Sequence, residues 1–189
     1  ITTRLVGSEM CIRDRLTFDN EEGKGAFWHT TSHIMAQAIK RLYPDTKLAI
    51  GPSIENGFYY DIDRETPFAA EDLEKIEKEM KKICKEGKKI YRREVSKAEA
   101  MEMFKDDMYK LDLISNLEDG NITVYDQGDF TDLCRGPHVD NTKLCKNFKL
   151  VKHSGVYWKG DANNHVMQRI YGVCFPTAEE PVSYTHLRA

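Results

Sequence analysis

Residues 26–43 read AFWHTTSHIMAQAIKRLY, and this stretch is expected to decide the fold. Its apolar side chains recur close to helical spacing, at Phe27, Ile34, Ala38 and Leu42. This period predicts an α-helix. Pro44 follows directly and is expected to end the helix, because proline cannot continue one. Further small and apolar residues between the periodic positions indicate that the helix is buried on more than one side.

The remaining sequence predicts two more helices and a series of short strands. One helix is expected over residues 69–86, stopped by Gly87, and a short one follows the capping-box pattern of Ser96 and Glu99. Strands are expected at 48–50, 58–63, 90–95, 109–114, 122–125, 148–151 and 155–158, the first two forming a hairpin. The segment 166–175 either continues the sheet or begins an exit helix. Closely spaced strands predict an α+β fold, with an antiparallel sheet packed around a central helix.

Composition limits the classes of protein to consider. The 189 residues are 31% charged and 40% hydrophobic, which is typical of a globular domain. The formal net charge of -3 is not that of a nucleic-acid binder, so RNA contact would need a local basic patch. No apolar run has the length of a membrane span, so no membrane partner is expected. The few scattered cysteines indicate a reducing compartment, so we expect a cytoplasmic protein.

Both ends of the chain resemble sequence that is not part of the natural protein. Residues 6–15 and 182–189 resemble translations of the two strands of a sequencing-library adapter. We therefore interpret residues 1–15 as adapter-derived, 16–177 as one domain, and 178–189 as a linker remnant followed by adapter-derived sequence. Such segments are kept out of the fold prediction.

Two pairs of residues with equal spacing carry the chemistry. His29 and His33 are four positions apart on the predicted helix, and Cys134 and His138 are four apart in a turn-rich segment. On a helix this spacing places both side chains on one face. Together the four can hold a tetrahedral zinc ion or line a hydrolytic pocket without metal. The plainer alternative is structural: two helix histidines and a turn with a buried thiol.

The motifs around these pairs make the chain recognisable. It resembles the editing domain of threonyl-tRNA synthetases, the second additional domain, which also occurs in alanyl-tRNA synthetases and in free-standing trans-editing proteins. The resemblance covers about residues 18–177 and is carried by FWHTTSH at 27–33, AIGPSIENGFYYD at 49–61, DLCRGPHV at 132–139, GVYWKGD at 155–161 and QRIYG at 168–172. The second and third of these motifs point to the threonyl branch.

The resemblance implies an activity and a set of site residues. The activity is hydrolysis of the ester in seryl-tRNA(Thr), since a threonine site discriminates weakly against a substrate that lacks one methyl group. The implied catalytic residues are His29, His33, Lys110, Asp132, Cys134 and His138. Tyr60 and Arg135 are expected to contact substrate, although an aromatic residue on a strand is more often part of the core.

Cofactors and partners follow from the same resemblance. His29, His33, Cys134 and His138 match zinc-ligand positions in the alanyl relatives, whereas the threonyl branch can work without metal. We expect no metal requirement for editing, with zinc as the open alternative. The parent enzyme would use ATP and zinc in a synthetase core outside this chain and would be a homodimer through other domains. The expected partner is the acceptor end of tRNA(Thr).

Two alternative functions remain open at this level. One is a free-standing trans-editing hydrolase that requires zinc, and the other is a non-catalytic zinc module that binds RNA. Basic patches expected to contact RNA phosphates comprise Lys149, Lys152 and Lys159, and Lys143 with Lys146. Lysines of this kind are also common as ordinary solvated charge.

Overall fold

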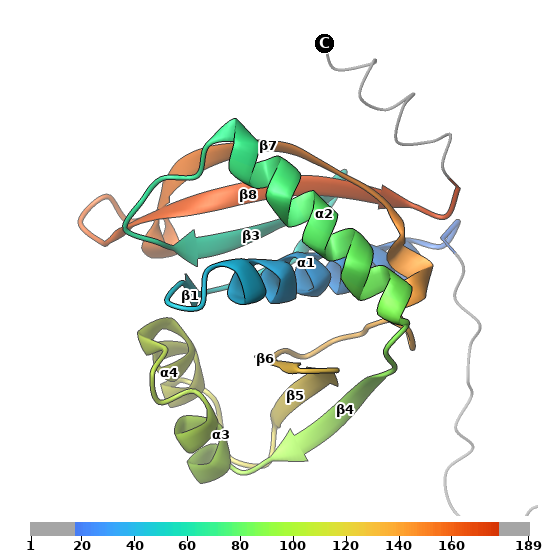
Figure 1. The fold of residues 1–189 in the computed structure, drawn as a ribbon. Coiled ribbons are helices and arrows are strands. Elements are labelled where there is room, and N and C mark those ends of the chain that lie inside the picture. The colour runs from blue at the N-terminus through green and yellow to red at the C-terminus, as the bar shows by residue number, and fades with distance from the viewer. Residues whose placement is uncertain (1–17, 178–189) are drawn as a thin grey trace, which may run out of the picture.

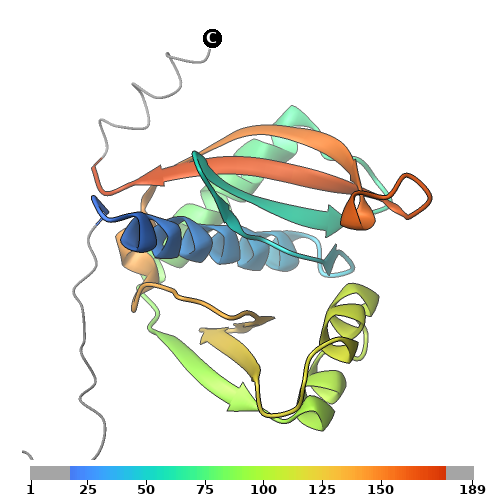
Figure 2. The same ribbon diagram turned by 180° about the vertical axis from the view of Figure 1, so that it is seen from behind.

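The computed structural model describes residues 18–177, so the segments interpreted above as adapter sequence lie outside the described residues. Helix α1 (Glu21–Leu42) lies between two antiparallel sheets (Figure 1). The larger sheet has the order β1-β3-β8-β7, with β2 also paired to β3, and the smaller has the order β4-β5-β6. Figure 2 shows the same three layers from behind. The predicted α+β fold with a central helix is confirmed, although its strands form two sheets.

Helix α1 begins five residues before the predicted start. The Asn20 side chain caps it by accepting hydrogen bonds from the backbone N–H groups of Glu22 and Gly23. The helix ends at Leu42, next to Pro44, as predicted. It is buried continuously from Thr30 to Ile39, because sheets lie on two sides and another helix packs against it.

The larger sheet is built from two distant parts of the sequence. Strands β1 (Lys47–Leu48), β2 (Ser53–Ile54) and β3 (Gly57–Asp63) form the predicted hairpin. Strand β8 (Val166–Phe175) pairs with β3, so residues 166–175 continue the sheet. The two strands predicted at 148–151 and 155–158 are one strand, β7 (Asn147–Tyr157), with a register shift between Leu150 and Lys152. The short 3-10 helices η1 (Thr142–Cys145) and η2 (Trp158–Gly160) flank β7.

Helix α2 (Ala70–Glu86) packs across α1 and the larger sheet, as Figure 1 shows. Its apolar positions Ile76, Met80 and Ile83 are fully buried in the main core, in agreement with their three- and four-residue spacing. Gly87 ends the helix in the left-handed conformation, with φ of 61°, as its position predicted.

The smaller sheet carries its own pair of helices. It comprises β4 (Ile90–Val95), β5 (Ile122–Gln127) and β6 (Phe130–Leu133), and β6 lies within a segment that was expected to be a loop. Helix α3 (Lys97–Met103) begins at the predicted capping box of Ser96 and Glu99. The prediction of a strand at 109–114 is wrong, because this segment is helix α4 (Met108–Ser115). The Asp107 carboxylate caps α4 and so favours helix over strand.

Across residues 18–177, we find no helix with both the length and the apolar character needed to span a lipid bilayer.

Candidate functional site

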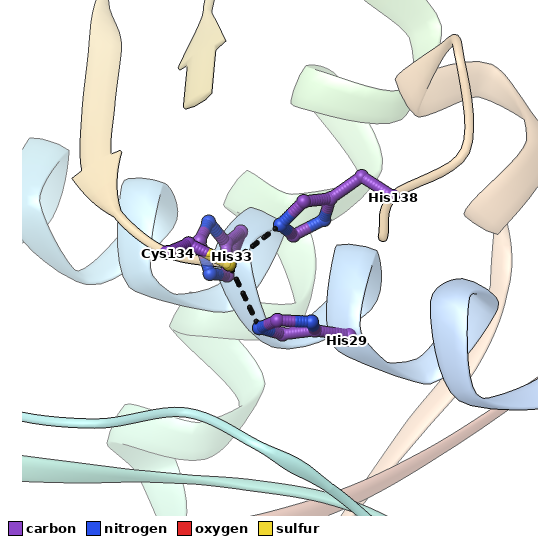
Figure 3. A group of neighbouring side chains, drawn as sticks. All are labelled: His29, His33, Cys134 and His138. Atoms are coloured by element: carbon purple, nitrogen blue, oxygen red, sulfur yellow. Dashed lines mark hydrogen bonds between the residues drawn. The ribbon is translucent and has the colours of Figure 1, made fainter. Parts of the chain in front are cut away.

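The two predicted pairs meet in space. His29 and His33 come from the middle of α1, Cys134 follows the end of β6, and His138 lies in the loop beyond it (Figure 3). The Cys134 sulfur lies 3.3 Å from Nε2 of His29 and 3.1 Å from Nε2 of His138. One donor atom from each of the four residues lies within 4.8 Å of the others. We call these four residues the quartet.

Thr30 fixes which nitrogen of His138 carries hydrogen. The Thr30 hydroxyl donates to the carbonyl of Ala26 at 2.7 Å and accepts from the backbone N–H of Val139 at 3.0 Å. The same oxygen lies 3.1 Å from Nδ1 of His138. Because the hydroxyl hydrogen is already engaged, Nδ1 must be the donor in this contact. Nε2 then carries the lone pair, and it faces the Cys134 sulfur.

The loop between Cys134 and His138 is shaped by glycine and proline. Gly136 has φ of 76°, and a Cβ atom there would overlap the Tyr125 hydroxyl. Its backbone N–H donates to the Cys134 sulfur at 3.1 Å. The Gly136–Pro137 peptide bond is cis. This backbone returns the chain so that His138 packs against the rings of His33 and Tyr125, with both centroid distances 4.4 Å.

His33 is buried and the other three quartet residues are half-buried, which favours their uncharged forms. Burial lowers the pKa of His29, with the Asp132 charge opposing this effect. Burial also lowers the pKa of His33 and of His138 strongly, and neighbouring histidines lower both further. Burial raises the pKa of the Cys134 thiol to about 12. At neutral pH without metal, the site therefore holds neutral imidazoles and a protonated thiol.

A buried charged group lies beside the quartet. Lys110 from α4 contacts Asp132 from β6, with Nζ 2.5 Å from Oδ1, and the two side chains are only 3% and 2% exposed. Tyr60 from β3 donates to the other carboxylate oxygen at 2.6 Å and accepts from Lys110 at 3.1 Å. Burial and the Asp132 charge hold the pKa of Tyr60 well above its ordinary value, so it remains a hydrogen-bond donor. His33 lies 3.6 Å from Asp132 and connects this group to the quartet.

A hollow of about 430 Å³ opens onto both groups, and we call it the reaction hollow. Seven of the eight predicted site residues line it: His29, His33, Tyr60, Lys110, Asp132, Cys134 and Arg135. His138 does not line it, and instead supports Cys134 from behind. The remaining wall is largely apolar or backbone, from Ala49–Ser53 and from Leu113, Leu117 and Leu133. Such a hollow is suited to a small polar group attached to an apolar or aromatic one.

Several residues of this site were not predicted from the sequence. Thr30 is one, and a hydroxyl residue between two helical histidines was its available signal. Thr123 is another, because its hydroxyl donates to the carbonyl of Cys134 and fixes the start of the loop. Tyr125, which packs on His138, gave no signal beyond its place in a predicted strand.

The donor set of the quartet is compatible with zinc. Bond lengths of about 2.3 Å to sulfur and 2.0–2.1 Å to nitrogen place S and N about 3.5 Å apart in a tetrahedral site. The two sulfur–nitrogen distances of 3.3 Å and 3.1 Å are close to this value. The fixed lone pair on His138 also faces the shared centre. Metal binding would require loss of the thiol proton, which burial opposes.

Two of the predicted RNA-contacting lysines are paired with acids. Lys149 lies 3.0 Å from Glu77, and Lys159 lies 2.6 Å from Asp112. Lys143 and Lys146 line a separate groove between α2 and η1. The lysine patches remain a prediction, and pairing weakens the first of them.

Comparison with known proteins agrees with this geometry. Residues 122–171 match the family described as the threonyl and alanyl tRNA synthetase second additional domain. The threonine–tRNA ligase of Finegoldia magna is 60% identical over 169 residues, covering 88% of this chain and 27% of the ligase. That of Clostridioides difficile is 55% identical over 180 residues, 94% of this chain and 28% of the ligase.

The threonine–tRNA ligase of Acetivibrio thermocellus is 53% identical over 177 residues, 92% of this chain and 28% of the ligase. The chain therefore spans 27–28% of the length of these relatives. Residues 122–171 thus match the second-additional-domain family, and the three relatives are threonine–tRNA ligases, so these comparisons support recognition of the chain as an editing-domain fragment of the threonyl-tRNA synthetase type.

Proposed function

We propose that this domain hydrolyses the ester bond of tRNA(Thr) mischarged with serine. The observation that supports the proposal best is the reaction hollow, where neutral histidines face a buried Lys110–Asp132 pair. An ester hydrolase needs a proton acceptor for water and a positive group for the developing oxyanion. Both line one small hollow.

Serine is the amino acid that a threonine-specific ligase would mischarge. It lacks one methyl group relative to threonine, and such a difference gives only about 10–200-fold discrimination. A second site that clears the error is the usual solution. The relatives named as threonine–tRNA ligases support this substrate, and the parent protein would join threonine to tRNA(Thr) with ATP through residues outside this chain.

The residues suggest a division of roles. A water molecule attacks the ester carbonyl carbon, and its proton passes to His29, a neutral imidazole on the wall of the hollow. Lys110 stabilises the negative charge on the carbonyl oxygen, and Asp132 with Tyr60 holds the ammonium in place. The ribose oxygen then leaves and takes a proton back, giving free serine and tRNA.

Zinc, where present, would be held by the quartet. Its chemistry would be to polarise a carbonyl or to acidify a bound water. With all four residues as ligands no open position remains, so a reactive site needs one of them to stay free. The neutral thiol and the Lys110 ammonium make the metal-free route our preferred one.

The test compares two acylated tRNAs. Seryl-tRNA(Thr) and threonyl-tRNA(Thr) are each incubated with the full 189-residue chain, and the loss of amino acid is followed over time. We expect faster loss of serine, and a fall to background in the Lys110→Met variant. Seryl minihelices provide a control for weak binding of whole tRNA. Background rates for both amino acids on both carriers, with and without added zinc, would contradict the proposal.

The same experiment separates the alternative functions. A trans-editing hydrolase that requires zinc would lose activity with a chelator, whereas the proposed route retains it. A non-catalytic zinc module would bind metal tightly and leave both esters intact.

A further inference from the structure

A second hollow adjoins the reaction hollow. It has a volume of about 550 Å³ and lies between β4 and the segment that connects α4 to β5. The two hollows share four wall residues, Leu117, Asn121, Thr123 and Arg135. The two hollows are therefore adjacent along these residues, so a single extended ligand has both within reach.

Two guanidinium groups line the second hollow. Arg135 follows Cys134 directly, and its exposed side chain forms no hydrogen bond or ion pair with the residues that the structure describes. Within residues 18–177, the Arg92 side chain on β4 forms one ion pair, with Glu94 at 2.9 Å, and the two side chains are 49% and 67% exposed. An exposed pair of this kind is weak, so Arg92 is available to a stronger anion.

The direction of the substrate connects these observations. In the proposed reaction the ester is at the sugar hydroxyl of the terminal nucleotide, next to Cys134 and Lys110. The phosphate of that nucleotide is on the other side of the sugar, so the strand leaves the reaction hollow away from the quartet. The wall that the two hollows share includes Leu117 and Arg135, and the second hollow is lined by two arginines.

We infer that the second hollow binds the phosphodiester backbone of the unpaired nucleotides that precede the terminal adenosine, with Arg92 and Arg135 as the phosphate ligands. This inference rests on the proposed function. A guanidinium binds phosphate through two parallel N–H groups, which also fixes the path of the strand. Contacts of this type read the backbone and not the base sequence.

Glu118 and the two arginines are expected to affect RNA binding in opposite directions. Its carboxylate lines the same hollow and would repel a phosphate. The Glu118→Gln variant is therefore expected to bind the strand more tightly, while loss of either arginine weakens binding. A surface that binds the ligand through apolar contacts or base stacking alone would not show these opposite effects.

The experiment measures binding of a 5′-fluorescein-labelled RNA pentamer that ends in CCA and carries no amino acid. Fluorescence anisotropy with the full chain gives Kd at several salt concentrations. We expect Arg92→Gln and Arg135→Gln each to raise Kd several-fold and to reduce the slope of log K against log salt by about 0.7. Arg93→Gln is the matched control, because Arg93 lies next to Arg92 on β4 but pairs with Asp126 on the other face of the strand.

The outcomes are distinct. Absence of binding by the parent chain, or equal Kd and salt slope in parent and both arginine variants, would overturn the inference. Because the probe has no aminoacyl ester, the result is independent of deacylation. If both arginine variants weaken RNA binding but the parent chain leaves seryl esters intact, the RNA site is supported and the proposed function is rejected. If the parent chain cleaves the ester but both variants bind RNA as tightly as the parent, only the RNA site is rejected.

Discussion

Three imidazole rings share one buried space around Cys134, and burial is the main force on their protonation. A proton on any ring would lack water around it and would repel charge on the others, while Asp132 is already paired with Lys110. The folded site therefore excludes protons that the unfolded chain would accept. This difference links the site to the stability of the whole chain.

The free energy of unfolding is expected to decrease as the pH falls. The three histidines have folded pKa values below 6.5, so the unfolded state binds more protons as the pH falls through 6.5. Unfolding free energy is then expected to fall from about pH 6.5 downward, by up to about 1.4 kcal/mol per pH unit for each histidine. Urea titrations between about pH 7.5 and 5 measure it.

Replacing His138 with glutamine should make this fall shallower. His153→Gln is the control for loss of an imidazole, since His153 is exposed on β7. A stability that does not change over this pH range, or equal slopes in the parent and His138→Gln, would show that the rings accept protons in the folded state.

Thr30 is a positioning residue that acts through His138. The Thr30→Val variant keeps the shape but removes the acceptor for Nδ1–H and for the Val139 N–H. We expect about a 10–100-fold slower deacylation of seryl-tRNA(Thr), as for loss of a hydrogen-bond partner behind a site histidine. ¹⁵N chemical shifts of His138 should show a mixture of tautomers. Thr30→Ser should restore both the rate and the single tautomer, and a slow rate with an unchanged tautomer would contradict this role.

At the scale of elements, the N-terminus of α2 is capped on one side only. The Asp72 carboxylate accepts from the backbone N–H of Ala69 at 3.1 Å, as in a capping box, but the alanine methyl group returns no hydrogen bond. Helix α3 shows the complete motif, in which Ser96 and Glu99 satisfy each other's backbone N–H groups. The chain thus has an incomplete capping box at α2 and a complete one at α3, which can be compared directly.

We expect Ala69→Ser to stabilise the chain by about 0.5–1 kcal/mol, because Ala69 already has the extended backbone of an N-cap, with φ of -100° and ψ of 167°. Ser96→Ala should cost a similar amount for the opposite reason. Denaturant midpoints at constant slope measure both changes. An Ala69→Ser variant no more stable than its parent would mean that the serine hydroxyl prefers water to the Asp72 N–H.

Elements with a local signal were predicted well, and those without one were not. The apolar periodicity of α1 and α2 and the capping box before α3 each depend only on residues close together in the sequence. Helix α4 was mistaken for a strand because Tyr109–Ile114 contains β-favouring residues, while its helical state depends on the Asp107 cap and on burial of Tyr109 and Lys110. The single strand β7 was divided because the polar residues Lys152, His153 and Ser154 interrupt its apolar pattern, but pairing with β8 keeps them extended.

At the scale of the molecule, one face of α1 binds the smaller sheet through a row of residues spaced by four: His29, His33, Gln37 and Arg41. The first two belong to the site. Gln37 then exchanges hydrogen bonds with Gln127 on β5, accepting from its side chain at 2.8 Å and donating to its carbonyl at 3.1 Å. Arg41 pairs with Asp129 in the turn that follows. The quartet thus lies in the same interface that joins the two sheets.

This interface explains the limit of prediction from sequence for the site. Local motifs predicted the quartet and Asp132, and the family resemblance predicted Lys110. Gln37, Thr30 and Arg92 were missed, since each gains its role only from a partner on another element. No periodicity indicates that Gln37 faces Gln127, ninety positions away, or that Arg92 lies beside the shared wall of two hollows.

The Gln37–Gln127 pair is expected to set the distance between the two halves of the site. Both side chains are buried, at 1% and 2% exposure. Gln37→Leu leaves the Gln127 side-chain N–H group without its acceptor, and Gln127→Leu leaves the Gln37 side-chain oxygen without its donor. Each change should cost about 1–3 kcal/mol of unfolding free energy. The double variant should cost less than the sum, because it removes both polar groups. Its deacylation of seryl-tRNA(Thr) should nevertheless remain slow, since an apolar contact does not fix the position of Cys134 relative to His29. Additive stability costs, or full activity in the double variant, would show that the pair only fills space.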